Sequence, residues 1–352
     1  KTKNPTLELM NTFMNLLIKN SLLLLILLMY SCSFSQTKNK KEFKIMFYNV
    51  ENLFDTINDP HANDEEFLPN SKRNWNSKRF YKKINNLYKV IAETGEWTVP
   101  DFIGFAEVEN RFCIEALIKN SPLYTKKFSV IHFDSNDPRG IDVAAIYNPK
   151  TFSLIESRKI VVKIKADKEY ITRDILYAKG FVNSVDTFHI FVNHWPSRRG
   201  GKGDSEFKRI SVAKTLRQSV DSIFKKNSSA KIVIMGDFND HPYDKSIREY
   251  LAAIYPYNGE NIENVLYNMS AGGKGQGTYY YKGKWEILDQ FIVSGGLLKK
   301  YNGTEYKIID ADFLLDDDEK YMNKKPHKTY NSINYSGGYS DHLPIRLSIP
   351  LN

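Results

Sequence analysis

Acid, amide and imidazole side chains stand at the ends or inside six apolar segments of the sequence. The residues with this placement are Asn49, Glu107, His194, Asp237, Asn239, Asp289, Asp341 and His342. A carboxylate within an apolar strand is costly to bury unless it is paired or binds a metal. Oxygen ligands without a cysteine or histidine cluster suit a hard cation such as Mg²⁺, which also binds water and phosphate oxygens. The set therefore predicts a Mg²⁺ site at the strand ends, with Mn²⁺ or Ca²⁺ as alternative ions.

Each of these residues also has a purely structural interpretation when it is taken alone. Asn49 and Asn239 could cap turns, Glu107 could be a surface acid, and Asp237 could begin a turn. The occurrence of eight such residues in equivalent positions favours one functional site over eight unrelated turns.

The elements that must position these residues can be predicted from hydrophobic periodicity. The predicted strands span residues 43–50, 101–108, 129–133, 142–147, 152–162, 175–183, 187–194, 231–236, 286–293 and 345–349. The predicted helices span residues 78–93, 112–119, 205–225 and 244–254. Some strands follow one another directly and others are separated by a helix. We therefore expect one domain with two packed mixed β-sheets flanked by helices.

The composition favours a folded, strand-rich and basic domain. The chain has 352 residues, of which 41% are hydrophobic and 13% aromatic, and its formal net charge is +9. Aromatic side chains pack well on a pleated surface. A basic surface favours partners rich in phosphate, such as nucleic acid or anionic lipid. The two cysteines, Cys32 and Cys113, provide no disulfide framework.

The N-terminal segment has the pattern of a secretory signal. An apolar run at residues 22–29 follows Lys19, and it is too short to span a bilayer. Two processing routes are open, namely lipid attachment at Cys32 in a stretch that resembles a bacterial lipoprotein signal, and cleavage before Gln36. The expected organisation is a signal segment at 1–35, a linker at 36–42 and a folded domain at 43–352. The expected location is outside the cytoplasm, as an outer-membrane lipoprotein or a periplasmic or extracellular protein.

Seven motifs carry a family resemblance: YNVEN, AEVEN, RGIDVAAIYN, NHWPSRRGG, GDFND, LDQFIVS and SDHLP. In this order they resemble the endonuclease/exonuclease/phosphatase superfamily, which includes nucleases similar to pancreatic deoxyribonuclease, abasic-site endonucleases, bacterial sphingomyelinases and inositol polyphosphate phosphatases. The variants of two motifs look most like those of predicted secreted bacterial members. The resemblance implies a four-layered α/β sandwich. Two positions depart from the family pattern, because Ala106 replaces a usual Gln and Leu288 follows Ile287 where Arg-Ile is frequent.

The resemblance implies a role for the residues around a metal and a base. Glu107 would be the main metal ligand with Asn49 beside it, and Asp341 would join the metal and water network. His342 would be the general base that activates water, and Asp289 would hold its ring. A carboxylate partner fixes the tautomer of an imidazole and stabilises the cation that forms when it takes a proton.

The remaining residues would act on the phosphate. His194 would bind the scissile phosphate or protonate the leaving oxygen, while Asp237 and Asn239 would orient the nucleophile and stabilise charge at phosphorus. Which histidine is the acid and which is the base stays open.

Four arginines are predicted to contact the substrate. Arg139 and Arg173 are candidate phosphate contacts, although arginines in surface turns fit these positions equally well. Arg198 and Arg199 follow His194 in a basic loop and are predicted to track a nucleic-acid backbone.

Three functional hypotheses follow. The leading one is an exported or lipid-anchored, monomeric, Mg²⁺-dependent nuclease that hydrolyses DNA or RNA and meets the membrane only through Cys32. The second is a sphingomyelinase-like or inositol-phosphate phosphodiesterase or phosphatase, which would need exposed apolar residues at the mouth. The segment GTYYYKGKW at residues 277–285 could provide them, or could be a strand with its aromatics in the core. A non-catalytic binding domain comes third, since all eight site residues are present.

Overall fold

The computed structural model describes residues 42–351, except 97, 165–166, 168, 256–261 and 273–276, together with residues 14, 16, 19 and 20. Residues 42–350 form one compact unit. The predicted processing sites at Cys32 and Gln36 lie outside the described residues. No helix among the described residues is both long and apolar enough to cross a membrane.

The first large sheet has six strands in the order β14-β19-β1-β2-β4-β3. It is mixed, because β1 and β2 run parallel while the other neighbours are antiparallel. Its strands are β1 (Glu42–Leu53), β2 (Phe102–Val108), β3 (Ser129–His132), β4 (Asp142–Tyr147), β14 (Glu305–Ile308) and β19 (Ile345–Pro350).

The second large sheet has seven strands in the order β5-β6-β7-β8-β13-β10-β9. Within it, β7 and β8 are parallel, as are β9 and β10, and the other neighbours are antiparallel. Its strands are β5 (Phe152–Ile160), β6 (Ile175–Val182), β7 (Asp186–His194), β8 (Lys231–Asp237), β9 (Ala253–Ile254), β10 (Leu266–Asn268) and β13 (Asp289–Ser294).

The two sheets pack face to face through apolar side chains. The ring of Phe43 on β1 lies 6.3 Å from that of Phe152 and 5.8 Å from that of Phe188, both in the second sheet. Gly104 on β2 permits a close approach, since a Cβ atom there would lie 2.6 Å from the Met235 side chain on β8. The inner faces therefore form an apolar core that fixes the strand ends of both sheets relative to one another.

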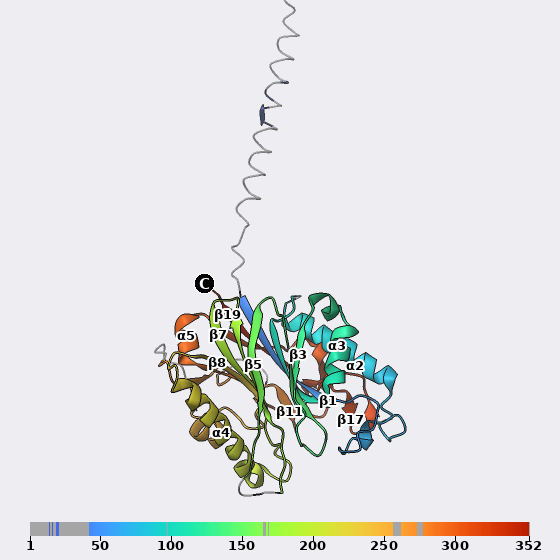
Figure 1. Ribbon diagram of the computed structural model, residues 1–352. Helices are drawn as coiled ribbons and strands as arrows, with labels where there is room; N and C mark the ends of the chain where they lie inside the picture. The colour runs from blue at the N-terminus through green and yellow to red at the C-terminus, as the bar shows by residue number, and fades with distance from the viewer. Residues whose placement is uncertain are drawn as a thin grey trace, which may run out of the picture. The chain divides into compact units, whose positions relative to one another are not determined.

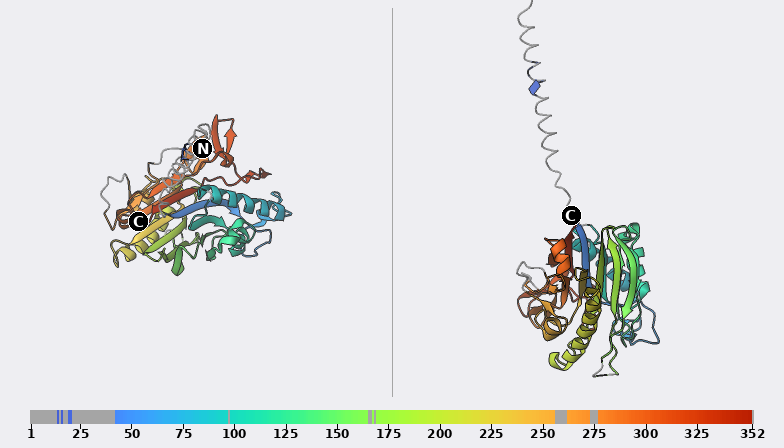
Figure 2. Two further views of the ribbon diagram at one scale, coloured as in Figure 1. Left: turned by 90° about the horizontal axis from the view of Figure 1, so that it is seen from above. Right: turned by 60° about the vertical axis from the view of Figure 1, so that its left-hand side comes forward.

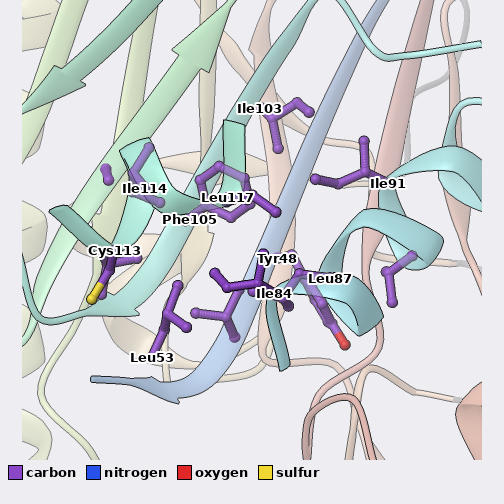
Figure 3. Packing of buried hydrophobic residues seen from close by; sticks show 14 of the residues in the cluster. Tyr48, Leu53, Ile84, Leu87, Ile91, Ile103, Phe105, Cys113, Ile114 and Leu117 are labelled. Atoms are coloured by element: carbon purple, nitrogen blue, oxygen red, sulfur yellow. The ribbon is translucent and has the colours of Figure 1, made fainter. Parts of the chain in front are cut away.

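Helices cover the outer faces and complete four layers. Figures 1 and 2 show α2 (Ser77–Thr94) and α3 (Arg111–Lys119) on one side of the paired sheets and α4 (Lys202–Phe224) on the other. Asn76 and Asn110 cap α2 and α3, because their side chains accept hydrogen bonds from backbone N–H groups of the first turn. The apolar faces of both helices meet β1 and β2 in a core cluster (Figure 3), whose labelled residues are Tyr48, Leu53, Ile84, Leu87, Ile91, Ile103, Phe105, Cys113, Ile114 and Leu117.

The smaller elements include three two-stranded hairpins. They pair β11 (Tyr279–Tyr281) with β12 (Lys284–Glu286), β15 (Leu315–Asp318) with β16 (Asn323–Pro326), and β17 (Tyr330–Asn331) with β18 (Asn334–Tyr335). The short helices are α5 (Gly295–Lys300), η1 (Glu65–Phe67), η2 (Pro122–Lys126), η3 (Ser246–Tyr250) and η4 (Asp312–Leu314).

Two predicted elements differ from the structure. The helix expected at 244–254 is wrong, because this segment forms one π-helical turn, η3, and then the strand β9, which pairs with β10. The strand expected at 286–293 is interrupted, because β12 ends at Glu286 and β13 begins at Asp289. In the second case Leu288 turns its carbonyl toward the N–H of Phe238, so the apolar run contains a corner that its composition does not reveal.

Candidate active site

Three predicted site residues lie side by side at one edge of the second sheet. In the parallel pair β7 and β8, His194 stands opposite Asp237, and in the antiparallel pair β8 and β13, Asp237 stands opposite Asp289. All three side chains are buried, with 4%, 2% and 1% exposure respectively. Strand pairing alone therefore brings an imidazole and two carboxylates from distant parts of the sequence into one row.

The neighbouring edge of the first sheet adds Asn49 and Glu107. The pairing of β1 and β2 is irregular after Asn49, and Glu107 has a left-handed φ of 64°. The N–H of Asn52 donates to Glu107 Oε2 at 3.0 Å, which holds the carboxylate. Asn49 Nδ2 lies 3.1 Å from Asp237 Oδ2 and 3.5 Å from Glu107 Oε1. A strained backbone at Glu107 thus turns its side chain toward the second sheet.

Asn49 links these carboxylates as a hydrogen-bond donor. Its Oδ1 accepts the N–H of Glu51 at 3.1 Å, so its amide nitrogen faces Glu107 and Asp237. This orientation differs from the predicted role of Asn49 as a metal ligand, because a metal would need the amide oxygen. The tight turn after Asn49, where Glu51 and Asn52 both have positive φ, provides the N–H that captures that oxygen.

His342 is held from three directions just before β19. Its Nδ1 lies 2.7 Å from Asp289 Oδ2, and its Nε2 lies 3.8 Å from Asp237 Oδ2. Its backbone N–H donates to Ser340 Oγ, which in turn donates to the carbonyl of Asn49. The Asp289 contact fixes the ring so that Nε2 points toward the other sheet edge.

The environments of the two histidines move their pKa values in opposite directions. Burial lowers the pKa of His342, but the charge and hydrogen bond of Asp289, with the charges of Asp237 and Asp341, outweigh it and hold the pKa well above its ordinary value. Burial lowers the pKa of His194 well below its ordinary value, and the positive charge of Arg173 adds to this effect. His342 is therefore the more basic of the two rings, and His194 is the less basic.

His194 faces the same carboxylates as His342. Its Nε2 lies 3.6 Å from Asp237 Oδ2 and 3.8 Å from Glu107 Oε1, while its buried Nδ1 has no hydrogen-bond partner within the described residues. Asn239 extends this edge: its N–H donates to Asp237 Oδ1 at 2.9 Å, and its Nδ2 donates to the carbonyl of Trp195. Asp237 is thus the centre of the cluster.

A cavity of about 530 Å³ opens onto these groups. Among the predicted residues that line it, His194, Asp237, Asn239, Glu107, Asp341 and His342 form the floor; its other lining residues are Arg139, Ser197, Arg198, Arg199, Lys202, Tyr279, Tyr281, Glu286 and Leu288. Asn49 and Asp289 support the floor from behind through the contacts described above. The cavity therefore combines this acidic floor with a cationic wall, which consists of Arg139, Arg198, Arg199 and Lys202. Such an arrangement can bind an anionic group next to a metal and a base.

The four predicted arginines differ in whether they line the cavity and in whether other residues already hold their side chains. Arg173 does not line the cavity, because it is 4% exposed and donates to Asp137 and to the carbonyl of Trp195. Its predicted contact with substrate is therefore corrected to a supporting role. Arg198 lines the cavity but is held by Glu286 and by the carbonyl of Asn239.

The last two predicted arginines are more accessible. Arg139 has a side chain exposed by 44%, and its only ion pair in the described part of the chain is with Asp137 at 3.4 Å. Arg199 is exposed and makes no ion pair or hydrogen bond with the described residues. These two side chains can meet an anionic ligand at the cavity mouth.

Residues 44–350 match the sequence model of the endonuclease/exonuclease/phosphatase family. The chain belongs to this family. No curated protein matches it. Among solved structures, TDP2 from Caenorhabditis elegans aligns with a TM-score of 0.53 and 13% identity, over 88% of this chain and 75% of that chain.

Two further solved structures come from Bacteroides thetaiotaomicron. An endonuclease/exonuclease/phosphatase family protein aligns with a TM-score of 0.53 and 14% identity, over 88% of this chain and 98% of that chain. A mannosyl-6-phosphatase aligns with a TM-score of 0.53 and 14% identity, over 87% and 98%. At these identities the likeness concerns the fold, and it confirms the predicted α/β sandwich.

A divalent cation, on which enzymes of this family generally depend, fits the acidic floor. Glu107, Asp237 and Asp341 form no ion pair with a lysine or arginine among the described residues. No such side chain within 4 Å offsets the charge of these three carboxylates. Ligand atoms of Asp237, Asp289 and His342 lie within 4.8 Å of one another, a spacing that a metal ion could bridge. Because Asp289 already holds His342, the oxygens of Glu107 and Asp341 remain the better candidates for a hard cation.

Sequence reasoning missed three residues that position the site. Thr278 Oγ1 accepts the N–H groups of Leu288 and Asp289, and Ser340 ties His342 to Asn49. Glu51 lies beside the buried Lys83, at 4.0 Å, and supplies the N–H for Asn49. The single acid of YNVEN is a usable signal for Glu51, whereas single hydroxyl residues carry no pattern.

Proposed function

We propose that this member of the family is a divalent-cation-dependent phosphodiesterase, and specifically a nuclease. The observation that carries the proposal is the contact of 2.7 Å between His342 and Asp289 beneath a cavity with a cationic wall. A buried carboxylate that fixes an imidazole is the arrangement required for a general base. A phosphate ester is the anionic substrate that both the wall and the family fold favour.

The proposed reaction is hydrolysis at phosphorus. Water forms a new bond to phosphorus, and His342 Nε2 takes one proton of the attacking water. The bond to the leaving oxygen breaks with its electron pair on that oxygen, which takes up a proton from solvent. Asp289 stabilises the imidazolium that results. A cation held by Glu107 and Asp341 would offset negative charge on the phosphoryl oxygens.

Other residues bind the phosphate in this proposal. His194, which is held neutral, presents its Nε2 to a phosphoryl or leaving oxygen and does not deliver a proton from a charged state. Asp237 keeps His194, His342 and Asn239 in a fixed arrangement, and Asn239 is near enough to orient the attacking water. The motifs leave the acid and base roles open, and this proposal takes His342 as the base.

A polyanionic substrate is supported by charge. Arg139, Arg199 and Lys202 line the cavity, and the formal net charge of the whole chain is +9. Contacts of this kind release counterions from nucleic acid and produce a strong dependence on salt. The proposal includes export by the apolar run at 22–29, with Cys32 as a lipid attachment point, and action as a monomer.

A second candidate is a phosphatase for a small phosphorylated sugar or inositol. A cavity of about 530 Å³ has room for such a ligand, and a mannosyl-6-phosphatase shares the fold. Most residues that line the cavity are charged or polar, which favours this candidate more than the sphingomyelinase-like alternative, since that alternative needs exposed apolar residues at the mouth.

The test is hydrolysis by the purified protein with Mg²⁺, Mn²⁺ or Ca²⁺. Substrates are plasmid DNA, RNA, hexose 6-phosphates, inositol phosphates and sphingomyelin, and the Asp237→Ala His342→Ala double variant is the control. Nucleic-acid cleavage that disappears in the double variant supports the nuclease. Hydrolysis of a small phosphate ester alone would instead select the second candidate, and activity that survives in the double variant would refute the site.

A further inference from the structure

The three consecutive tyrosines of β11 point to alternate faces of the strand. Tyr279 and Tyr281 line the cavity, whereas Tyr280 between them packs against Trp285, with ring centres 5.2 Å apart at 64°. Side chains two residues apart share one face of a strand. The sequence left a membrane-facing patch and a core strand as alternatives for this segment, and the structure uses the aromatics differently on the two faces.

Tyr279 fixes this strand to the catalytic base. Its backbone forms a β-bridge with His342, and the two ring centres lie 4.8 Å apart. The adjacent Thr278 accepts the N–H of Leu343 at its carbonyl and that of Asp289 at its hydroxyl. Any group that β11 presents to the cavity is therefore held at a fixed place relative to the reacting atoms.

Tyr281 is the group presented at the mouth. It lines the cavity while remaining 53% exposed, and it is the last residue of β11 before the turn at Lys282 and Gly283. Gly283 has φ 84° and lies under the ring of Tyr321, since a Cβ atom there would come within 2.6 Å of Tyr321 Cδ1. The hairpin β15–β16 thus packs against the turn that follows β11, and this contact holds the strand that carries the exposed ring of Tyr281. Figure 1 labels β11 in its place among the other strands.

Charges around this ring identify the kind of ligand that fits it. Lys282 Nζ lies 5.2 Å from the centre of the Tyr281 ring, and the cationic wall contributes Arg139 and Arg199 to the same cavity. A ligand that matches these features carries phosphate groups beside a flat ring. Aromatic side chains beside a cationic groove stack on the bases of single strands, because a base inside a duplex is already stacked on its neighbours.

We propose that Tyr281 stacks on an unpaired nucleobase next to the scissile phosphate, so that the substrate is single-stranded nucleic acid. This inference rests on the proposed nuclease function and specifies its substrate. Tyr281 acts in binding and does not touch the reacting atoms. Its loss should therefore raise KM and leave kcat nearly unchanged.

The experiment compares the wild-type protein with Tyr281→Ala and Tyr281→Phe, and with Tyr124→Ala as a control. Tyr124 is another exposed tyrosine, at 67%, and does not line the cavity. The substrates are one labelled single-stranded oligonucleotide, the same strand in a duplex, and a strand of equal length whose sugars carry no bases. A hexose 6-phosphate is included as a small ester.

The expected result is faster cleavage of the single strand than of the duplex, and a KM for the single strand that Tyr281→Ala raises by about 5- to 150-fold. Tyr281→Phe keeps the ring and should recover most of this loss, while Tyr124→Ala should behave as wild type. The strand without bases should bind weakly to every variant.

Two outcomes would overturn the inference in distinguishable ways. Nucleic-acid hydrolysis with the same KM in wild type and Tyr281→Ala would leave the nuclease intact and refute the stacking. Hydrolysis of the hexose phosphate without any nucleic-acid cleavage would refute the nuclease and the stacking together.

Discussion

Replacing Asp289 with Asn tests whether this carboxylate holds and charges the base. Asp289 is 1% exposed, and its Oδ2 lies 2.7 Å from His342 Nδ1. An amide of the same shape can keep a hydrogen bond but carries no charge. If its NH₂ group faces the ring, it forces the proton onto Nε2, where the base must be free to accept one from water.

The magnitude follows from these two losses. A hydrogen bond between charged partners contributes about 1.5–3 kcal/mol, which is about a 10- to 150-fold change in rate if it is made with the imidazolium. A wrong tautomer removes general-base catalysis altogether, which is worth about 10²–10⁴-fold. We therefore expect Asp289→Asn to lower kcat by about 10²–10⁴-fold with little change in the folded structure.

The pH dependence of kcat should shift in a direction that a general loss of structure would not reproduce. Asp289 is the main group that raises the pKa of His342 against the effect of burial. Without its charge the pKa falls, and the acid limb of the kcat profile, where the base becomes protonated, moves to lower pH. The assay is a pH–rate profile under saturating substrate, with Asp221→Asn on the exposed side of α4 as the control. A kcat within fivefold of wild type, or an acid limb at higher pH, would show that Asp289 does not serve His342.

Three further predictions test other parts of the site and the fold. Glu107→Gln should abolish stimulation by divalent cations and weaken cation binding measured by calorimetry, and unchanged binding would exclude Glu107 as a ligand. Burial and nearby acids raise the pKa of Glu109 to about 8, so the folded state holds an extra proton between about pH 4.5 and 8. The free energy of unfolding should fall by about 1.4 kcal/mol per pH unit as pH rises through this window. Glu109→Gln should flatten that slope in denaturant titrations, and an equal slope in both proteins would contradict the raised pKa of Glu109. Arg199→Ala should weaken nucleic-acid binding and lower the slope of log K against log salt by about one, whereas an unchanged slope would argue against a phosphate contact.

Much of the site was predictable because strand ends are readable from sequence. His194, Asp237 and Glu107 each follow a short apolar run, and such runs are reliable strand signals. Their meeting was not readable in the same way, because it depends on which strands pair and in what register. The parallel pairing of β7 with β8 and the packing of β1 against the second sheet make the cluster. The motifs supplied this information only through the family resemblance.

The two corrections at the site share one physical cause, which is that the sequence does not show which hydrogen-bond partner a polar side chain takes. Arg173 in the segment TRDIL has the composition of an exposed turn, yet Asp137, 36 residues earlier, draws its guanidinium into the interior. Asn49 was predicted to offer its oxygen to a metal, and the N–H of Glu51 in the turn takes that oxygen instead. In both cases the residue belongs to the site region, but a hydrogen-bond partner decides what it can do there.

The same reasoning explains why the cavity has two unlike walls. The arginines come from loops that follow β7 and precede β4, whereas the tyrosines come from a hairpin inserted between β10 and β13. The floor, by contrast, is built from strand ends that the two packed sheets hold rigidly. A fold of this kind can keep its hydrolytic chemistry constant while one hairpin changes which ester fits. The ring of Tyr281 is therefore where substrate choice can change without disturbing His342 or Asp237, and comparing KM with kcat in its variants measures that separation directly.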